Sequence, residues 1–216
     1  MSTSQKNDDG LMAGLPRWAD LVIGVVLTVP SLPVMVVLAT ITFFDMGTPV
    51  IYRQKRVGRC GNLFTLFKFR TMTEEAPGPA ITASSDDRIT RTGRWMRKFK
   101  LDELPEIINV LRGDMAMVGP RPEVPRFVDL EDELWQSILR VRPGVTDPAT
   151  IKFWDEEQLL ATEFGNVEHY YATDVLPKKL ELQYQYLTKR SWRTDLSVLA
   201  STASIFFRSF TRAKPL

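Results

Sequence analysis

The chain has 216 residues, of which 44% are hydrophobic and 25% are charged, and its formal net charge is +2. This length and composition suit one globular domain, alone or with a small appendage, and supply enough apolar residues for a core. The single cysteine, Cys60, and the single histidine, His169, exclude an internal disulfide, a Ser-His-Asp triad and most zinc sites. Any catalysis therefore depends on carboxylate, Lys, Tyr or Arg side chains, or on a hard metal ion.

The charges are segregated along this nearly neutral chain. Residues 53–70 and 88–100 each hold six basic side chains, whereas residues 123–133 are mainly acidic. Basic blocks of this kind predict a local anionic partner, either phosphate groups or an anionic membrane surface. Nucleic acid is the competing interpretation, but no nucleic-acid module is visible and aromatic residues do not interleave with the basic ones. We therefore expect no nucleic-acid partner.

The first predicted element is an apolar segment, Leu21 to Phe44, that contains no charged side chain. It is long enough to span the hydrocarbon core of a bilayer as a helix. Pro30, Ser31 and Pro33 interrupt its middle, because each proline removes a backbone donor and clashes with the preceding turn. Two structures fit: a kinked helix that crosses the bilayer, and a helix–break–helix that returns to the same face. A buried core helix is a third option, which a long uncharged run disfavours.

The re-entrant structure is the one we predict for residues 15–46. Two prolines in a spanning helix would leave carbonyl groups unpaired in hydrocarbon, with no neighbouring membrane helix to satisfy them. A return to the same face also puts Arg17 and Arg53 on the cytoplasmic side, as the positive-inside rule favours. We expect a flexible N-terminus over residues 1–14.

A β-hairpin is predicted next, with strands at 50–52 and 63–70 joined by a turn at 57–62. Residues 74–87 read as a loop. Helical spacing then runs from Ile89 to Leu111, with a bend near Asp102 because Pro105 is tolerated only in a first turn or at a kink.

Three further helical stretches follow. Residues 123–140 and 155–190 are predicted as mainly helical, and residues 192–210 form an amphipathic helix. That last helix is either interfacial, lying on the membrane surface, or packed on the core as a terminal helix. A basic C-terminal tail spans residues 211–216.

The adjacent carboxylates of Asp102 and Glu103 are the principal candidates for chemistry. They follow a basic block and precede Gly119-Pro120-Arg121-Pro122. Neighbouring like charges are unfavourable unless a cation or a substrate stabilises them, which favours a reactive site. The alternative is a solvated acidic step that suits the dipole at a helix start.

Several motifs together resemble one family, the monotopic phosphoglycosyl transferases, also called bacterial sugar transferases. The resemblance spans residues 15–210. The matching stretches are Gly47-Thr48-Pro49-Val50-Ile51-Tyr52-Arg53-Gln54-Lys55-Arg56-Val57-Gly58, Phe67-Lys68-Phe69-Arg70-Thr71-Met72, Arg88-Ile89-Thr90-Arg91-Thr92-Gly93-Arg94, Leu101-Asp102-Glu103-Leu104-Pro105, Gly113-Asp114-Met115, Val118-Gly119-Pro120-Arg121-Pro122 and Val141-Arg142-Pro143-Gly144-Val145-Thr146.

The resemblance implies a reaction and a fold. Family members transfer a sugar 1-phosphate from a UDP-sugar to a membrane polyprenol phosphate, with Mg²⁺, and release UMP. Their membrane element is a re-entrant helix broken at a proline that aligns with Pro33. The implied fold is α+β: a mainly helical, membrane-associated single domain with a short β-hairpin and interfacial amphipathic helices. Residues 47–210 form its cytoplasmic sugar transferase domain, at the inner leaflet of the bacterial cytoplasmic membrane.

The family's site residues transfer onto matching positions. Asp102 matches the nucleophile and Glu103 the following Glu, and both are the candidate Mg²⁺ ligands. Lys68, Arg97 and Arg121 match positions near the phosphates, although each could instead be a solvated or lipid-facing base. A carboxylate nucleophile and a hard metal ion need no further His or Cys, so the composition agrees.

The sequence departs from the family pattern at two places. Asp147-Pro148-Ala149-Thr150 replaces Gly-Trp-Ala-Gln, and Gln183 stands where many members have an acidic residue. The sugar is therefore less defined than the reaction, and a homodimer is left open. Two other functions compete: a non-catalytic membrane scaffold, and a membrane-anchored module that binds nucleic acid or anionic lipid.

Overall fold

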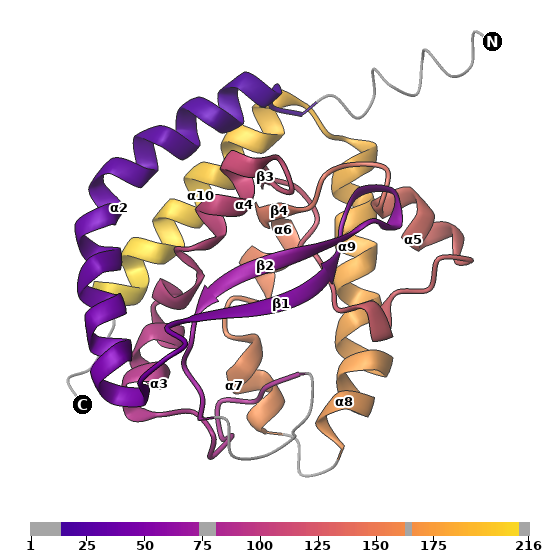
Figure 1. The fold of residues 1–216 in the computed structure, drawn as a ribbon. Helices are drawn as coiled ribbons and strands as arrows, with labels where there is room; N and C mark the ends of the chain where they lie inside the picture. Colours follow the sequence, from indigo (N-terminus) through magenta and orange to yellow (C-terminus); the bar gives the residue numbers. More distant parts are fainter. Residues whose placement is uncertain (1–13, 74–80, 163–165, 212–216) are drawn as a thin grey trace, which may run out of the picture.

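The computed structural model describes residues 14–73, 81–162 and 166–211. The predicted flexible N-terminus and basic tail lie outside these residues, apart from Gly14 and Thr211, as does half of the predicted loop at 74–87. The described part is mainly helical with two small two-stranded sheets (Figure 1), which confirms the α+β prediction.

The apolar segment forms one long helix, α2 (Arg17–Met46). It continues through Pro30 and Pro33, so the predicted break is a bend within one helix (Figure 1). The prolines have no N–H for the carbonyls four residues earlier, while the Ser31 and Thr28 hydroxyls donate to the carbonyls of Thr28 (3.1 Å) and Gly24 (2.7 Å). Two side-chain hydroxyl donors therefore lie beside the prolines, where backbone donors are missing.

Helix α2 exposes most of its apolar surface. Its most apolar eighteen-residue window has a mean hydropathy of 2.5, and 11% of that window is buried. Within the described residues it is the one helix that is long and apolar enough to cross a membrane by length and composition. A core helix of a soluble protein would be largely buried, so this helix differs from the core-helix alternative.

Both ends of α2 contact the rest of the fold. At its start, Arg17 donates to the carbonyl of Val110 at 2.6 Å, and the Asp20 carboxylate accepts from the backbone N–H of Met117 at 2.9 Å. Near its end, Leu38 packs in a small core with Phe69 and other apolar residues. Figure 1 shows α2 as an arc whose two ends turn toward the same body.

The predicted hairpin is present. Strand β1 (Ile51–Val57) pairs antiparallel with β2 (Leu63–Phe69), in a register that sets Ile51 opposite Phe69 and Val57 opposite Leu63. A 3-10 turn, η1 (Arg59–Gly61), joins them. The first strand is longer than predicted because its alternation includes charged residues that face solvent.

The chain bends at the carboxylate pair, as predicted. Helix α3 (Arg91–Lys98) ends before Lys100, which adopts the left-handed conformation at φ 54°. A 3-10 turn, η2 (Leu101–Glu103), and helix α4 (Glu106–Arg112) follow, with Pro105 at the N-cap. This arrangement places Asp102 and Glu103 between two helices.

Two short strands escaped the sequence analysis. Strands β3 (Ala116–Val118) and β4 (Gly144–Thr146) form a parallel pair. Three residues are too few to show an alternating pattern. A Cβ on Gly144 would lie 2.1 Å from the backbone nitrogen of Gly119, so this close approach requires glycine.

The predicted helix over 123–140 is wrong over its first half. That stretch contains only a 3-10 turn, η3 (Pro125–Phe127), before helix α5 (Glu133–Ile138). The Asp132 carboxylate accepts from the backbone N–H of Trp135 at 2.9 Å and fixes the start of α5. The residue before Pro125 is extended, as sterics require.

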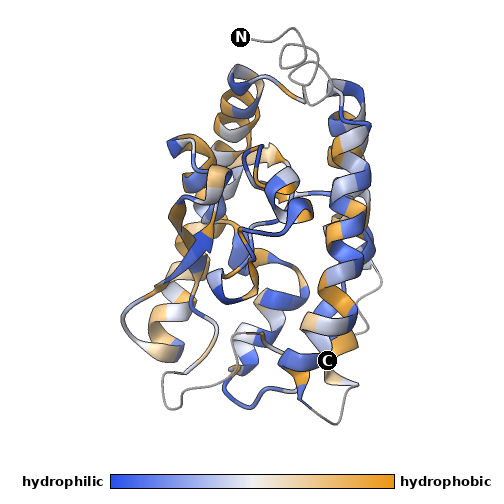
Figure 2. Ribbon diagram, turned by 90° about the vertical axis from the view of Figure 1, so that its right-hand side faces the viewer, coloured by the Kyte–Doolittle hydropathy of each residue, from blue (hydrophilic) through white to orange (hydrophobic). Residues whose placement is uncertain are grey.

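Six elements complete the described part of the fold; the first, α6 (Pro148–Lys152), was not predicted, and the others follow the prediction for 155–190 and 192–210. These others are α7 (Glu156–Ala161), α8 (Val167–Tyr170), a π turn η4 (Tyr171–Val175), α9 (Leu176–Thr188) and α10 (Trp192–Thr211). Figure 2 shows hydrophobic and hydrophilic residues mixed along the long helix on its right-hand side. In α10, Val198 is buried whereas Trp192 and Phe207 are 52% and 68% exposed, so α10 packs on the core and also presents aromatic side chains outward.

Candidate active site

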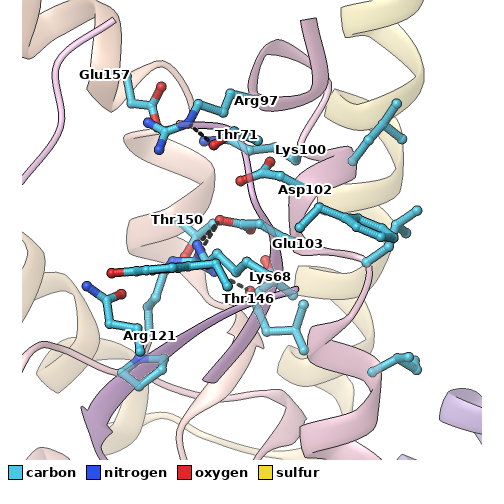
Figure 3. A pocket seen from close by; sticks show the side chains of 18 of the residues that line it. Lys68, Thr71, Arg97, Lys100, Asp102, Glu103, Arg121, Thr146, Thr150 and Glu157 are labelled. Carbon is cyan, nitrogen blue, oxygen red and sulfur yellow. Dashed lines mark hydrogen bonds and ion pairs between the residues drawn. The ribbon is translucent and has the colours of Figure 1, made fainter. Parts of the chain in front are cut away.

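A cleft of about 1720 Å³ gathers the predicted site residues. Lys68, Arg97, Asp102, Glu103 and Arg121 all line it, although they come from β2, α3, η2 and the loop after β3. Pro30 and Ser31 of the membrane helix line it as well, and Pro33 is not among its lining residues. Figure 3 shows the Asp102 carboxylate between Arg97 on one side and Glu103 on the other.

Asp102 is a buried carboxylate with an unused oxygen. Its residue is 7% exposed, and its Oδ1 atom has no hydrogen-bond partner within the described part of the chain. Burial raises the pKa of Asp102, and the negative charge of Glu103 raises it further, while Lys68 and Arg97 act in the opposite direction. An anion here is poorly solvated and therefore reactive toward an electrophile that enters the cleft.

Glu103 is held by two cations. Its Oε1 atom accepts from Lys68 Nζ at 2.8 Å and from an Arg121 guanidinium N–H at still closer range. Burial alone would raise its pKa, but the charges of Arg121 and Lys68 lower the pKa of Glu103 well below its usual range. Glu103 is therefore ionised and fixes both cations at the edge of the cleft.

Glu106 is a third carboxylate that the sequence analysis missed. It is 1% exposed, and its Oε1 atom lies 3.5 Å from Lys68 Nζ and 3.6 Å from Arg121. Neither carboxylate oxygen makes a hydrogen bond to the described residues. Burial raises the pKa of Glu106 to about 7. Its place three residues after Glu103, at the start of a helix, was the signal available in the sequence.

Arg97 reaches the cleft from α3. Its Nε donates to the Thr71 hydroxyl at 2.9 Å, and its guanidinium pairs with Glu157 at 3.1 Å. Gly93 permits this packing, because a Cβ there would lie 2.2 Å from the Thr71 carbonyl oxygen. The contacts orient Arg97 along the rim beside Asp102 instead of joining it to that carboxylate.

Arg121 is positioned by the two departures from the family pattern, which contact one another. The Asp147 carboxylate accepts from the backbone N–H of Arg121 at 3.1 Å and from the Gln183 side-chain amide at 2.7 Å. It also caps α6 by accepting from Thr150 N at 2.5 Å. The Arg121 side chain donates to the Val145 carbonyl at 3.1 Å. Asp147 and Gln183 therefore form one buried unit behind Arg121.

Asp102 and Glu103 could supply two of the ligands of a hard cation such as Mg²⁺. Within the described residues no group of three or more His, Cys, Asp or Glu side chains is arranged to hold a metal ion. Mg²⁺ commonly uses one or two carboxylates and takes its other ligands from substrate phosphates and water. Asp102, with its unpartnered oxygen, and Glu103 fit that smaller requirement.

The cleft is amphipathic as well as charged. Leu27, Pro30 and Val34 of α2 and Phe206 and Phe207 of α10 line the same cavity as the carboxylates. A ligand that fills it meets cations and carboxylates at one part and apolar helices at another. This chemistry matches a phosphate group attached to a hydrocarbon chain.

Comparison with known proteins agrees with the geometry. Residues 12–209 match the model of the family described as bacterial sugar transferase. An uncharacterised sugar transferase, EpsL, of Bacillus subtilis (strain 168) is 33% identical over 87% of this chain and 85% of its own length. A UDP-glucose:undecaprenyl-phosphate glucose-1-phosphate transferase of Klebsiella pneumoniae is 32% identical over 90% of this chain.

A further relative is named UDP-N-acetylgalactosamine-undecaprenyl-phosphate N-acetylgalactosaminephosphotransferase, from Aeromonas hydrophila, and is 30% identical over 88% of this chain. The chain spans 42% of that protein's length and 40% of the Klebsiella protein's. The family match nevertheless covers nearly the whole chain. The chain belongs to the bacterial sugar transferase family.

Proposed function

We propose that the protein transfers a sugar 1-phosphate from a UDP-sugar to undecaprenyl phosphate or a similar polyprenol phosphate, releasing UMP. The product is the lipid-linked sugar on which a glycan is assembled. One observation carries the proposal: a buried carboxylate with an unpartnered oxygen, Asp102, lies in a cleft that is charged and also lined by apolar helices. The names of the relatives point to the same donor and acceptor.

The proposed chemistry has two displacements at one phosphorus. An Asp102 oxygen attacks the phosphorus that carries the sugar, the bond from that phosphorus to the bridging oxygen breaks, and UMP leaves with the electron pair. An oxygen of the polyprenol phosphate then attacks the same phosphorus, and the bond to Asp102 breaks and restores the carboxylate. Covalent catalysis of this kind replaces one difficult transfer with two easier ones.

The neighbouring residues supply charge and orientation. Lys68 and Arg121, which pair with Glu103, would bind the phosphate oxygens, and Arg97 lines the same cleft. Phosphoryl-type transfer depends mainly on such positioning and charge neutralisation. Mg²⁺ held by Asp102 and Glu103 would supply further neutralisation of the diphosphate when bound.

The membrane arrangement we propose is monotopic, with α2 entering and leaving one leaflet. Its start is bonded to Val110 and Met117, and its end packs beside Phe69, so both ends contact the same folded body. A straight spanning helix would separate those ends by the thickness of the bilayer. The positive charge around the site favours the cytoplasmic leaflet of the bacterial inner membrane, with the catalytic domain facing the cytoplasm.

The test is release of UMP by the purified full chain with undecaprenyl phosphate and a panel of UDP-sugars. We expect Asp102→Asn to reduce turnover by several orders of magnitude, because an amide is a far weaker nucleophile. Asp129→Asn, at an exposed position, is the matched control and should leave turnover unchanged.

A second arm uses a labelled UDP-sugar without acceptor. The wild-type enzyme should retain label on the peptide that contains Asp102, and activity should fall when Mg²⁺ is chelated. Turnover without a labelled enzyme would contradict the covalent step. A folded wild-type protein that binds the donor and releases no UMP with any donor would instead support the scaffold alternative.

A further inference from the structure

A second group of ionisable side chains lines the cleft and takes no part in the proposed displacement. We call it the Tyr171 cluster, and its members are Arg56, Glu123, Glu156, Tyr171 and Lys179. They come from β1, the loop after β3, α7, η4 and α9. Within the described chain this cluster forms no hydrogen bond or ion pair with Asp102, Glu103 or Glu106.

The cluster is a continuous chain of hydrogen bonds. Arg56 pairs with Glu123 at 3.2 Å, and the Tyr171 hydroxyl donates to the other oxygen of that carboxylate at 2.6 Å. Lys179 Nζ donates to the Tyr171 oxygen at 3.1 Å and to Glu156 at 2.7 Å. Each partner therefore fixes the next, which gives a rigid polar wall.

Three members of the Tyr171 cluster are buried in the fold. Tyr171 is 1% exposed, and Glu123 and Lys179 are each 7% exposed. Tyr171 opens the π turn η4, a type of turn that is frequent at functional sites. A hydrogen-bonded group that is buried and still borders a large cleft is placed to meet a ligand.

The chemistry of the cluster favours a neutral ligand. Its two cations balance its two carboxylates, so it offers no excess positive charge to a phosphate. Lys179 Nζ uses two of its three donors on Glu156 and Tyr171, and Glu156 Oε1 accepts no hydrogen bond from the described residues. A spare donor beside a spare acceptor suits hydroxyl groups, each of which both donates and accepts.

The cluster also adjoins the phosphate-binding residues. Burial lowers the pKa of Arg121, but the carboxylates around it, Glu103 first and Glu156 among them, raise that pKa above its ordinary value. Glu156 therefore lies within electrostatic reach of Arg121. A donor molecule with its diphosphate at Arg121 would bring its attached rings to this wall.

We infer that the Tyr171 cluster binds the hydroxyl groups of a neutral ring of the nucleotide-sugar donor. The inference rests on the proposed function and adds to it the site that recognises the donor. Two rings have this chemistry, the transferred sugar and the ribose of the nucleotide. A binding experiment with donors that differ by one hydroxyl distinguishes them.

The experiment measures dissociation constants by calorimetry for Tyr171→Phe and Lys179→Gln in the detergent-purified full chain, each in an Asp102→Asn background that cannot form the covalent intermediate. Tyr170→Phe and Lys178→Gln are the matched controls, because neither residue lines the cleft. The ligand pairs are UDP-glucose with UDP-galactose, and UMP with dUMP. A ratio of two constants within one variant does not depend on the fraction of folded protein, so loss of stability cannot imitate the effect.

We expect one of the two ratios to change by about tenfold in both cleft variants, since each loses a hydrogen bond made by or to a charged group. A change in the UDP-glucose to UDP-galactose ratio identifies the sugar, and a change in the UMP to dUMP ratio identifies the ribose. Ratios unchanged from the Asp102→Asn parent in both pairs overturn the inference. Because the Asp102→Asn background binds donors without reacting, donor binding there together with no UMP release by the chain that retains Asp102 refutes the proposed function separately.

Discussion

Two of the three carboxylates within residues 102–106, Glu103 and Glu106, share the cations Lys68 and Arg121 at the edge of the cleft, and their environments make them chemically different. Glu103 receives hydrogen bonds from both Lys68 and Arg121, whereas Glu106 lies farther from the same cations and is more deeply buried. Burial without compensation favours the neutral acid, and direct pairing favours the anion. Glu103 and Glu106, three residues apart, therefore favour different protonation states.

Glu106 should make stability depend on pH. Its pKa is raised from 4.5 to about 7 in the fold, so between these values the folded state retains a proton that the unfolded state has lost. Stability should therefore fall as pH rises through this window. Between pH 5 and pH 8, the unfolding free energy of the wild type should fall by about 2 kcal/mol more than that of Glu106→Gln. Urea unfolding without divalent cations measures this difference. The exposed variant Glu131→Gln is the control, and an equal decrease in wild type and Glu106→Gln would contradict the prediction.

Arg121 should depend on the shape of its guanidinium as well as its charge. It contacts Glu103 and the Val145 carbonyl through separate nitrogens. Lysine keeps the charge but cannot reach two acceptors in this planar geometry. We expect Arg121→Lys to lower kcat/KM for the donor roughly tenfold or more. Arg126→Lys, with a side chain that is 57% exposed, should have normal kinetics. Normal kinetics in Arg121→Lys would show that the residue supplies only charge.

At the scale of elements, α6 and α9 are joined through buried polar contacts. The Asp147 carboxylate starts α6 and accepts from Gln183 of α9 and from the backbone of Arg121. The carboxylate is fully buried, so each of these donors replaces water. The loop that carries Arg121 is therefore held against both helices through Asp147.

Exchanging Gln183 for glutamate should break this link. A second carboxylate would face Asp147 without a donor between them, which costs about 1–3 kcal/mol of unfolding free energy. Gln185→Glu, two residues along α9 at an exposed position, should change stability by less than about 0.5 kcal/mol. Denaturant unfolding of both variants tests this, and equal stabilities of the two variants would contradict the prediction.

The bend in α2 allows both of its ends to reach the folded body. Replacing Pro30 and Pro33 with alanine restores two backbone donors and should straighten the helix, which separates Arg17 from Val110. In a Cys60→Ser background, cysteines at Ser4 and Asn62 should both be protected from an impermeant reagent in intact cells. The double alanine variant should expose Ser4. Labelling of Ser4 in the variant that retains both prolines would show that α2 spans the bilayer.

For the whole molecule, the sequence was most informative where local pattern decides structure. The apolar run of α2, the alternation in β2 and the bend at Pro105 follow from neighbouring residues. Contacts between distant residues were not predictable in this way. Tyr171 meets Glu123 across 48 positions and β3 meets β4 through three-residue strands, so neither leaves a local signal. The motifs predict phosphate binding by Lys68 and Arg121, but only the fold shows that both contact Glu103.

The curved course of α2 has a mechanical consequence in the proposed arrangement. A helix that enters and leaves through one face displaces lipid from that leaflet alone, and α10 adds exposed aromatic residues. The protein would then act as a wedge that enlarges one side of the bilayer relative to the other. Binding of such one-sided elements depends on curvature and lipid packing. Residence of the enzyme on a membrane would accordingly vary with the lateral tension of its host leaflet.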